Sequence, residues 1–203
     1  MPRKTVERRL AAILNADVVG YTRLMADDEL ATLETLNAYR GILAGLVRQH
    51  GGRVVDMVGD NLLAEFPSAV DAVQCALEAQ RQFVMRNAKL SPNRRMLFRM
   101  GLNVGDLIVD GERIVGDGVN IAARIQAIAE SGGLAISATV LDQIEGKLPI
   151  KVRDMGAHTL KNVPKPVHIY EVETEHLDVD TKGPVEGEAS AVNQHVQIGR
   201  AHV

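Results

Sequence analysis

The chain of 203 residues contains a single cysteine, Cys75. An intrachain disulfide is therefore impossible, and so little cysteine is typical of a protein made for a reducing compartment. We interpret Cys75 as a small buried hydrophobic residue on a helix rather than as a reactive thiol. Because 46% of the residues are hydrophobic, the chain can fill one good core. We expect a cytoplasmic protein with one domain and a tail.

Long apolar runs and an excess of basic charge are also missing. The apolar run from Leu10 to Leu14 follows a basic stretch, but it is too short for a signal peptide or a membrane span. The net charge is −3, and seven acidic residues lie in 171–203, so the remaining body is nearly neutral. Nucleic-acid-binding domains normally carry a basic face. We expect neither a nucleic-acid partner nor a membrane partner.

Two further signals are weak. The six histidines show no metal-ligand spacing such as HExxH, which favours surface or strand positions for them. A basic run surrounds a polar loop, and we interpret it as a solvated face, with a regulatory contact as the alternative. Its members are Arg86, Lys89, Arg94, Arg95 and Arg99.

Hydrophobic spacing predicts the order of the elements. We expect a buried strand at 10–19, a helix that Asp27 or Asp28 caps and that Gly51-Gly52 ends, a hairpin of strands 54–58 and 62–66, and a helix that begins at Pro67-Ser68. Strands at 97–104 and 107–109, a helix at 119–130, and strands at 134–137, near 152 and at 167–172 follow. The order β-α-β-β-α-β predicts an α+β fold, a ferredoxin-like sandwich with a C-terminal α/β extension.

Composition divides the chain into three parts. Residues 1–9 form a basic segment, and 10–172 form the folded domain. Apolar periodicity is lost in 173–203, which is acidic and rich in small residues. We interpret it as a flexible tail or as a linker to an additional C-terminal domain.

Two aspartates are candidate metal ligands. Asp17 ends the first strand, and Asp60 lies in the hairpin turn beside it, so the two carboxylates can converge and hold Mg²⁺ or Mn²⁺ against substrate phosphates. Gly20 and the backbone amides after it, at the start of the next helix, can cradle a triphosphate. The plainer alternatives are a turn residue for Asp60 and a strand-end cap for Asp17.

A second pair lies on the helix after Gly116-Asp117-Gly118. Asn120 and Arg124 are four residues apart, so both project from the same helix face. A capping role for Asn120 and a solvated position for Arg124 explain each residue equally well when taken alone.

The chain resembles the class III adenylate and guanylate cyclases. The resemblance rests on five segments in the family's order and spacing and covers about 10–172: ILNADVVGYTRLM, GGRVVDMVGDNLLAEF, RMGLNVGDLIV, VGDGVNIAARIQ and HTLKNVPKPVHIYEV. It implies a homodimer with shared active sites, in which one protomer supplies the metal aspartates and its partner the asparagine-arginine helix. It also implies two divalent metal ions, Mg²⁺ or Mn²⁺, and no bound organic cofactor.

The resemblance also assigns roles to individual residues. Asp17 and Asp60, with Val18 beside them, match the metal site, Asn120 the ribose-orienting asparagine, and Arg124 the transition-state arginine. Lys161 matches the lysine that contacts the triphosphate, and the phosphates are placed near Gly20, Tyr21 and Thr22.

Four positions depart from the family's common pattern. Asp56 stands where a base-reading lysine is usual, and Arg113 where an aspartate or threonine is expected. This reversed pair either reads adenine with exchanged roles or forms a salt bridge that touches no base, and Arg113 could also lie in an unrelated loop. Asn61 and Asn162 replace glycines, and at Asn61 we expect asparagine to tolerate a left-handed turn conformation.

The resemblance favours an adenylate cyclase that converts ATP to 3′,5′-cyclic AMP and pyrophosphate, because Asp56 would repel the 6-oxo group of guanine. The alternatives are a guanylate cyclase that uses GTP and a catalytically silent, nucleotide-binding regulatory domain. A polymerase-palm or cyclic-dinucleotide synthase shares the two-carboxylate sandwich, but the helix with Asn120 and Arg124 and the absence of a GGDEF-like hairpin argue against it.

Overall fold

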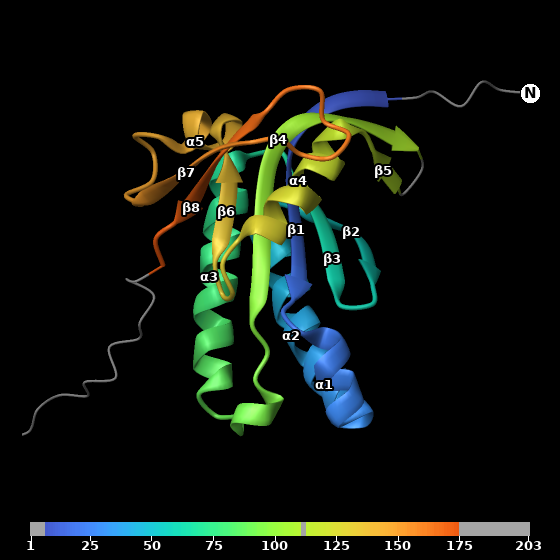
Figure 1. Cartoon of the computed structure of the whole chain (residues 1–203). Helices are drawn as coiled ribbons and strands as arrows, with labels where there is room; N and C mark the ends of the chain where they lie inside the picture. The colour runs from blue at the N-terminus through green and yellow to red at the C-terminus, as the bar shows by residue number, and fades with distance from the viewer. Residues whose placement is uncertain (1–6, 111–112, 175–203) are drawn as a thin grey trace, which may run out of the picture.

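The computed structural model describes residues 7–110 and 113–174, with the side chains of Asp110 and Arg113 left out (Figure 1). The elements follow in the order β1 (Glu7–Val18), α1 (Tyr21–Asp27), α2 (Glu29–Gln49), β2 (Arg53–Val58), β3 (Asn61–Phe66), α3 (Ala69–Asn87), a 3₁₀ turn (Pro92–Arg94), β4 (Phe98–Asp110), β5 (Arg113–Val115), α4 (Asp117–Ile128), β6 (Leu134–Ser137), α5 (Ala138–Ile144), β7 (Val152–His158) and β8 (Val167–Val172).

The strands form one eight-stranded sheet in the order β2-β3-β1-β4-β6-β8-β7, with β5 paired to the end of β4. β1 runs antiparallel to both of its neighbours, β3 and β4, as a βαββαβ unit requires. β6 continues the sheet parallel to β4, and the β7–β8 hairpin closes it. The predicted ferredoxin-like α+β fold with a C-terminal extension is confirmed.

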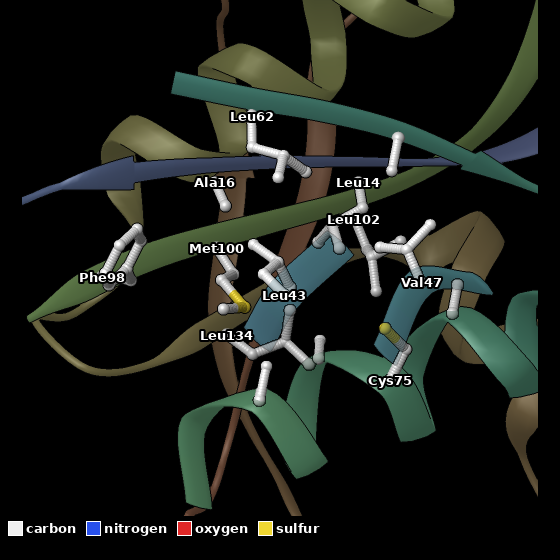
Figure 2. Packing of buried hydrophobic residues seen from close by; sticks show 14 of the residues in the cluster. Leu14, Ala16, Leu43, Val47, Leu62, Cys75, Phe98, Met100, Leu102 and Leu134 are labelled. Atoms are coloured by element: carbon white, nitrogen blue, oxygen red, sulfur yellow. The ribbon is translucent and has the colours of Figure 1, made fainter. Parts of the chain in front are cut away.

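Helices α2 and α3 cover one face of the sheet, and α4 crosses the other face (Figure 1). Because side chains alternate along a strand, Leu14 and Ala16 of β1 join the core beneath α2 and α3, whereas Ile13 packs against Ala122 of α4. Figure 2 shows the main core, in which Cys75 is fully buried. Burial raises the pKa of the Cys75 thiol to about 12, in agreement with a packing role.

Helix α4 lies directly on the backbone of β4. A Cβ at Gly101 would lie 2.2 Å from the amide nitrogen of Gln126 and 2.6 Å from the carbonyl oxygen of Ala122. A Cβ at Gly105 would similarly lie 3.1 Å from the Cα of Gly118. Glycine at these positions of β4 lets the helix and strand backbones touch, which fixes the height of α4 above the sheet.

Local chemistry explains the helix starts. The Asp28 carboxylate accepts a hydrogen bond from the amide of Ala31 at 3.0 Å, and the Ser68 hydroxyl accepts one from the amide of Asp71 at 3.2 Å, so both predicted caps are confirmed. The cap at Asp28 also separates α2 from the short helix α1. β1 begins at Glu7 rather than at Leu10, and β4 is one continuous strand.

The basic run does not form a shared solvated face. Arg94 donates to the carbonyl oxygen of Ala31 and to the hydroxyl of Thr35 on α2, and Arg86 stacks over the ring of Tyr39. Arg99 points to Asp17. These residues are close in sequence, but they lie on a helix, a loop and a strand, and their side chains point in different directions. Closeness in sequence alone does not show this.

Within 7–110 and 113–174, no helix is both long and apolar enough to cross a membrane. The predicted tail lies almost wholly in 175–203, outside the described residues.

Candidate active site

Asp17 and Asp60 face each other at one end of the sheet. Asp17 lies near the end of β1 on the face that α4 covers, and the carboxyl of Asp60 lies within hydrogen-bonding range of it. Burial, followed by the nearby Asp60, raises the pKa of the Asp17 carboxyl to about 7, and Arg99 opposes this shift from 3.7 Å. The structure therefore brings the two candidate metal ligands together.

The turn geometry places Asp60. Gly59 and Asp60 form a two-residue loop between paired residues Val58 and Asn61, and Gly59 has a φ of 60°. Glycine in the first position is what a tight type II′ hairpin turn requires. Asp60 can therefore stand at the tip without backbone strain of its own.

The tolerance of asparagine for a left-handed conformation is not used at Asn61. Among the non-glycine residues that the structure describes, only Asn162 has a positive φ, of 65°. Asn61 instead begins β3, and its side-chain amide donates to the Oδ1 of Asn15 at 2.8 Å. Replacement of the usual glycine therefore has a conformational basis at Asn162 and a hydrogen-bonding basis at Asn61.

The oxygen atoms that Asp17 and Asp60 offer are of the type that a divalent metal ion prefers. Two carboxylates supply hard oxygen ligands, which Mg²⁺ and Mn²⁺ prefer, and each ion then takes further oxygens from phosphates and water. In the part of the chain that the structure describes, no cluster of three or more His, Cys, Asp or Glu could hold a metal alone. Val18 is 2% exposed within the main core, so only its backbone carbonyl could join the site.

The start of α1 lies just beyond Asp17. Gly20 caps the helix with a φ of 67°, and its carbonyl accepts hydrogen bonds from the amides of Arg23 and Leu24. The amides of Tyr21 and Thr22 precede these and have no acceptor within the helix, as at any helix start. These amides are the ones that phosphate oxygens could use.

Asn120 and Arg124 lie on the exposed side of α4. Lys161 is exposed in the connection between β7 and β8, where a turn bond from Val163 to Leu160 precedes β8. In the described part of the chain, none of these three side chains makes a hydrogen bond or an ion pair. They are available to a ligand.

One protomer does not bring the start of α4 to the two aspartates. Gly118, in the first turn of α4, lies against Gly105, whereas Asp17 lies opposite Arg99. Gly105 and Arg99 are separated along β4 by about 20 Å, at roughly 3.3 Å per residue. Asn120, which lies beside Gly118 in sequence, therefore belongs to a different region of the protomer surface from Asp17.

The reversed base-reading pair is only partly described. Asp56 is exposed at a bulge in β2, and its carboxylate accepts a hydrogen bond from the amide of Met57 at 2.9 Å. Arg113 begins β5, which lies beside β2, but its side chain lies outside the described residues. The strand position of Arg113 excludes an unrelated loop, while the choice between base contact and salt bridge stays open.

A cavity of about 740 Å³ lies between the start of α4, the β6–α5 junction and the start of β8. Its lining includes Asn103, Thr139 and His168, but none of the residues predicted for metal, ribose or phosphate. Asn103 and Thr139 are already hydrogen bonded to each other and to the backbone. This cavity is therefore separate from the candidate site.

Sequence reasoning missed three residues around the aspartates, namely Arg99, Asn15 and Arg40. Asn15 interrupts an otherwise apolar buried strand. Arg40 falls in the apolar stripe of α2 between Leu36 and Leu43. A polar residue in a stripe that is otherwise core is a signal that could have found the last two.

Solved structures with this fold include nucleotide cyclases. An adenylate/guanylate cyclase/hydrolase from Silicibacter pomeroyi is 36% identical, with a TM-score of 0.77 over 82% of this chain and 98% of that one. The guanylyl cyclase Cya2 is 26% identical, with a TM-score of 0.72 over 82% of this chain and 93% of its own.

Sequence comparisons agree. A putative adenylate cyclase 3 of Rhizobium meliloti is 45% identical over 171 residues, which cover 84% of this chain and 29% of the relative. The chain thus spans less than a third of that relative's length. The model of the adenylate and guanylate cyclase catalytic domain matches residues 5–174. The chain belongs to the adenylate and guanylate cyclase catalytic domain family.

Proposed function

We propose that the chain is an adenylate cyclase that converts ATP to 3′,5′-cyclic AMP and pyrophosphate. In this reaction the ribose 3′-oxygen forms a bond to the α-phosphorus, the bond from that phosphorus to the bridging oxygen of the β-phosphate breaks, and the hydroxyl proton is lost to solvent. The observation that carries the proposal is the convergence of Asp17 and Asp60 beside the start of α1.

Asp17, Asp60 and the carbonyl of Val18 would hold two Mg²⁺ or Mn²⁺ ions, which would favour ionisation of the 3′-hydroxyl and neutralise phosphate charge. The amides of Tyr21 and Thr22 after Gly20 would bind phosphate oxygens, because helix amides without an intrahelical acceptor attract anions. The ribose, transition-state and pyrophosphate roles fall to Asn120, Arg124 and Lys161, whose side chains are exposed and have no partner within the described residues.

Asn120 would hold the ribose so that the 3′-oxygen lies in line with the leaving group. Arg124 would place a guanidinium against the oxygens of the transferring α-phosphoryl group, where negative charge builds up, and Lys161 would bind the outgoing phosphates. Because no covalent intermediate is needed, positioning and charge stabilisation supply the catalysis.

A symmetric homodimer would complete the site. Each protomer carries both groups of residues, but the start of α4 and Asp17 lie in different regions of its surface. If the aspartates of one protomer face α4 of its partner, two-fold symmetry creates two equivalent composite sites. Residues from both chains then surround each nucleotide.

Asp56 favours ATP over GTP. A carboxylate accepts hydrogen bonds but cannot donate them, so it matches the 6-amino group of adenine and opposes the 6-oxo group of guanine. Exposure on β2 leaves one oxygen of Asp56 free to face a base while the other accepts from Met57. The similarity to the guanylyl cyclase Cya2 keeps GTP as the second candidate substrate.

A direct assay tests the proposal. The purified protein is incubated with ATP or GTP and Mn²⁺, and the cyclic nucleotide and pyrophosphate are measured. We expect equal amounts of cyclic AMP and pyrophosphate, with GTP the poorer substrate. Binding of nucleotide without either product would instead favour a silent regulatory domain.

A further inference from the structure

Two hydrogen bonds from outside the hairpin hold the turn that carries Asp60. On one side, the guanidinium of Arg40 on α2 donates to the carbonyl oxygen of Gly59. On the other side, the side chain of Asn61 donates to Asn15 on β1 at 2.8 Å. The residues directly before and after Asp60 are therefore each tied to a different, well-packed element.

The turn needs such support because the end of the hairpin has little core beneath it. β2 is the outermost strand of the sheet, and near the turn its Met57 and Val58 are 42% and 68% exposed. Two strands without packing define the position of their connecting turn poorly. The bonds to α2 and β1 replace the packing that is missing.

Asn15, which holds the turn from β1, also lies on the same strand and face as Asp17. Side chains two residues apart on a strand share a face, so Asn15 and Asp17 both lie on the face that α4 covers. Asn15 is 5% exposed, and the hydrogen bond that it accepts from Asn61 joins β1 to β3 two residues before Asp17 and one residue after Asp60. The separation of the two carboxylates is thus linked to a buried hydrogen bond.

Electrostatics acts in the opposite direction. Two ionised carboxylates within hydrogen-bonding range of each other repel when no cation lies between them. A free turn would relieve this repulsion by moving away, and metal binding would then have to bring it back. A turn held in place avoids that cost.

Arg40 is a poor choice for stability alone. It lies in the apolar stripe of α2 between the buried residues Leu36 and Leu43, and its Nε is buried without a hydrogen-bond partner. A buried donor without a partner destabilises a fold, whereas an apolar residue would fill the same stripe without that cost. The Nε atoms of Arg86, Arg94 and Arg99 are buried without a partner in the same way, so the contact with Gly59 is what distinguishes Arg40.

We propose that Arg40 and the Asn15–Asn61 pair are positioning residues that hold the Asp60 turn against Asp17 for metal binding. The proposal rests on the assignment of Asp17 and Asp60 as metal ligands in the proposed function. Neither Arg40 nor the amide pair is assigned contact with substrate. They act through the place and rigidity of Asp60.

The test measures binding of Mn²⁺ alone, by electron paramagnetic resonance of the free ion and without nucleotide. Arg40→Met removes the donor but keeps a similar apolar stem, Arg40→Lys restores a donor, and Asn61→Ala removes the second anchor. Arg48→Met, at an exposed position on the same helix, is the matched control. Unfolding midpoints are measured in metal-free buffer for every variant.

We expect Arg40→Met and Asn61→Ala to weaken Mn²⁺ binding by about tenfold or more, within the range of substitutions that orient metal ligands. Arg40→Lys should recover most of the affinity, and Arg48→Met should bind as the wild type does. At saturating Mn²⁺, kcat should return close to the wild-type value, while the Mn²⁺ concentration for half-maximal turnover rises. The metal-free unfolding midpoint of Arg40→Met should be equal to or above that of Arg48→Met, whereas that of Asn61→Ala should fall, because the buried Asn15 loses its partner.

Asp60→Ala separates failure of this inference from failure of the proposed function. If Asp60→Ala binds Mn²⁺ as tightly as the wild type, the metal assignment itself is wrong. If Asp60→Ala loses Mn²⁺ but Arg40→Met and Asn61→Ala retain wild-type affinity, only the positioning role is overturned. A loss of affinity with a parallel fall of the unfolding midpoint in both anchor variants would also overturn it.

Discussion

At the end of β1 and the β2–β3 turn, the protein holds its functional side chains with its own contacts. Asp17 lies against Asp60 and Arg99, and the turn is bonded to α2 and β1. On α4 and in the β7–β8 connection, Asn120, Arg124 and Lys161 are exposed and unpaired within the described chain. The region around Asp17 and Asp60 is therefore organised without a ligand. The side chains on α4 and in the β7–β8 connection would make their contacts only with a ligand or a partner.

The difference matches the chemistry proposed for each region. Carboxylates that share metal ions must be held together against their mutual repulsion, which takes a rigid scaffold. Side chains that bind ribose and phosphate would bind more weakly if they had hydrogen-bond partners within the chain, because the nucleotide would have to displace those partners. The two regions should therefore respond to mutation in different ways.

The largest effect is expected at the aspartates. Asp17→Ala and Asp60→Ala should each lower metal-dependent turnover by at least about a thousandfold, because either change removes ligands that no neighbouring residue replaces. Production of cyclic AMP at saturating Mn²⁺ measures the effect. Asp142→Ala, at an exposed position on α5, is the matched control and should retain full turnover. Near wild-type rates in either active-site variant would refute the metal assignment.

The next effect tests whether the two regions meet across a dimer. Asp17→Ala and Arg124→Ala should each be inactive alone, whereas an equal mixture should recover about a quarter of wild-type activity, because half of the dimers would then be mixed and each would hold one intact site. Activity is measured in the unfractionated equal mixture, and co-purification with two different affinity tags checks separately that mixed dimers form. Mixed dimers without activity would show that the two residues do not serve a shared site.

A smaller effect is expected at the base. Asp56→Ala should lower the ratio of kcat/KM for ATP to that for GTP by about tenfold, since a buried mismatched hydrogen bond costs on the order of 1–3 kcal/mol. The Mn²⁺ dependence should be unchanged, because Asp56 is not a predicted ligand. Asp60→Ala, by contrast, should lose turnover with both nucleotides. An unchanged ratio would favour the salt bridge with Arg113.

The smallest effect concerns stability and pH. The pKa of Asp17 is about 7 in the folded protein and near 3.8 when unfolded, so the folded state binds more protons between these values. Metal-free protein should therefore lose stability as pH rises from about 4 to 7, with Asp17 contributing on the order of 1–2 kcal/mol after allowance for its partial exposure. Asp17→Asn should flatten this slope.

Chemical denaturation with a chelator present measures that slope, with Asp142→Asn as the control. Glu171, whose pKa burial raises to about 7, gives a slope of the same sign that both variants keep. An Asp17→Asn slope equal to that of the control would mean that the pKa of Asp17 is not raised in the metal-free protein.

The sequence predicted the meeting of Asp17 and Asp60 because it follows from topology. In a βαββαβ sheet the first strand lies beside the hairpin, and the pairing of Ala16 with Leu62 brings the strand end to the turn. The contacts that hold the turn were not predicted. Spacing marks Arg40 as a polar residue in an apolar stripe, but its bond to the carbonyl of Gly59 depends on how α2 packs on the sheet, which spacing does not show.

The asparagines show the same limit. Sequence identifies residues that tolerate a positive φ, but the positions that need one depend on the turn. Asn162 takes the left-handed conformation and Asn61 does not. Arg99 was likewise grouped with its sequence neighbours, although alternation from the buried Phe98 directs it to the opposite face of β4.

The direct contact of α4 with the backbone of β4 limits how such an enzyme can be controlled. With Gly101 against Ala122 and Gln126, and Gly105 against Gly118, helix and strand touch backbone to backbone at two points, which leaves little room for α4 to slide. A protein that regulates the proposed cyclase would find these contacts of α4 fixed relative to its own sheet. If the proposed homodimer forms, switching would have to rotate one whole protomer against its partner, and the angle between subunits, rather than the shape of either one, would carry the signal.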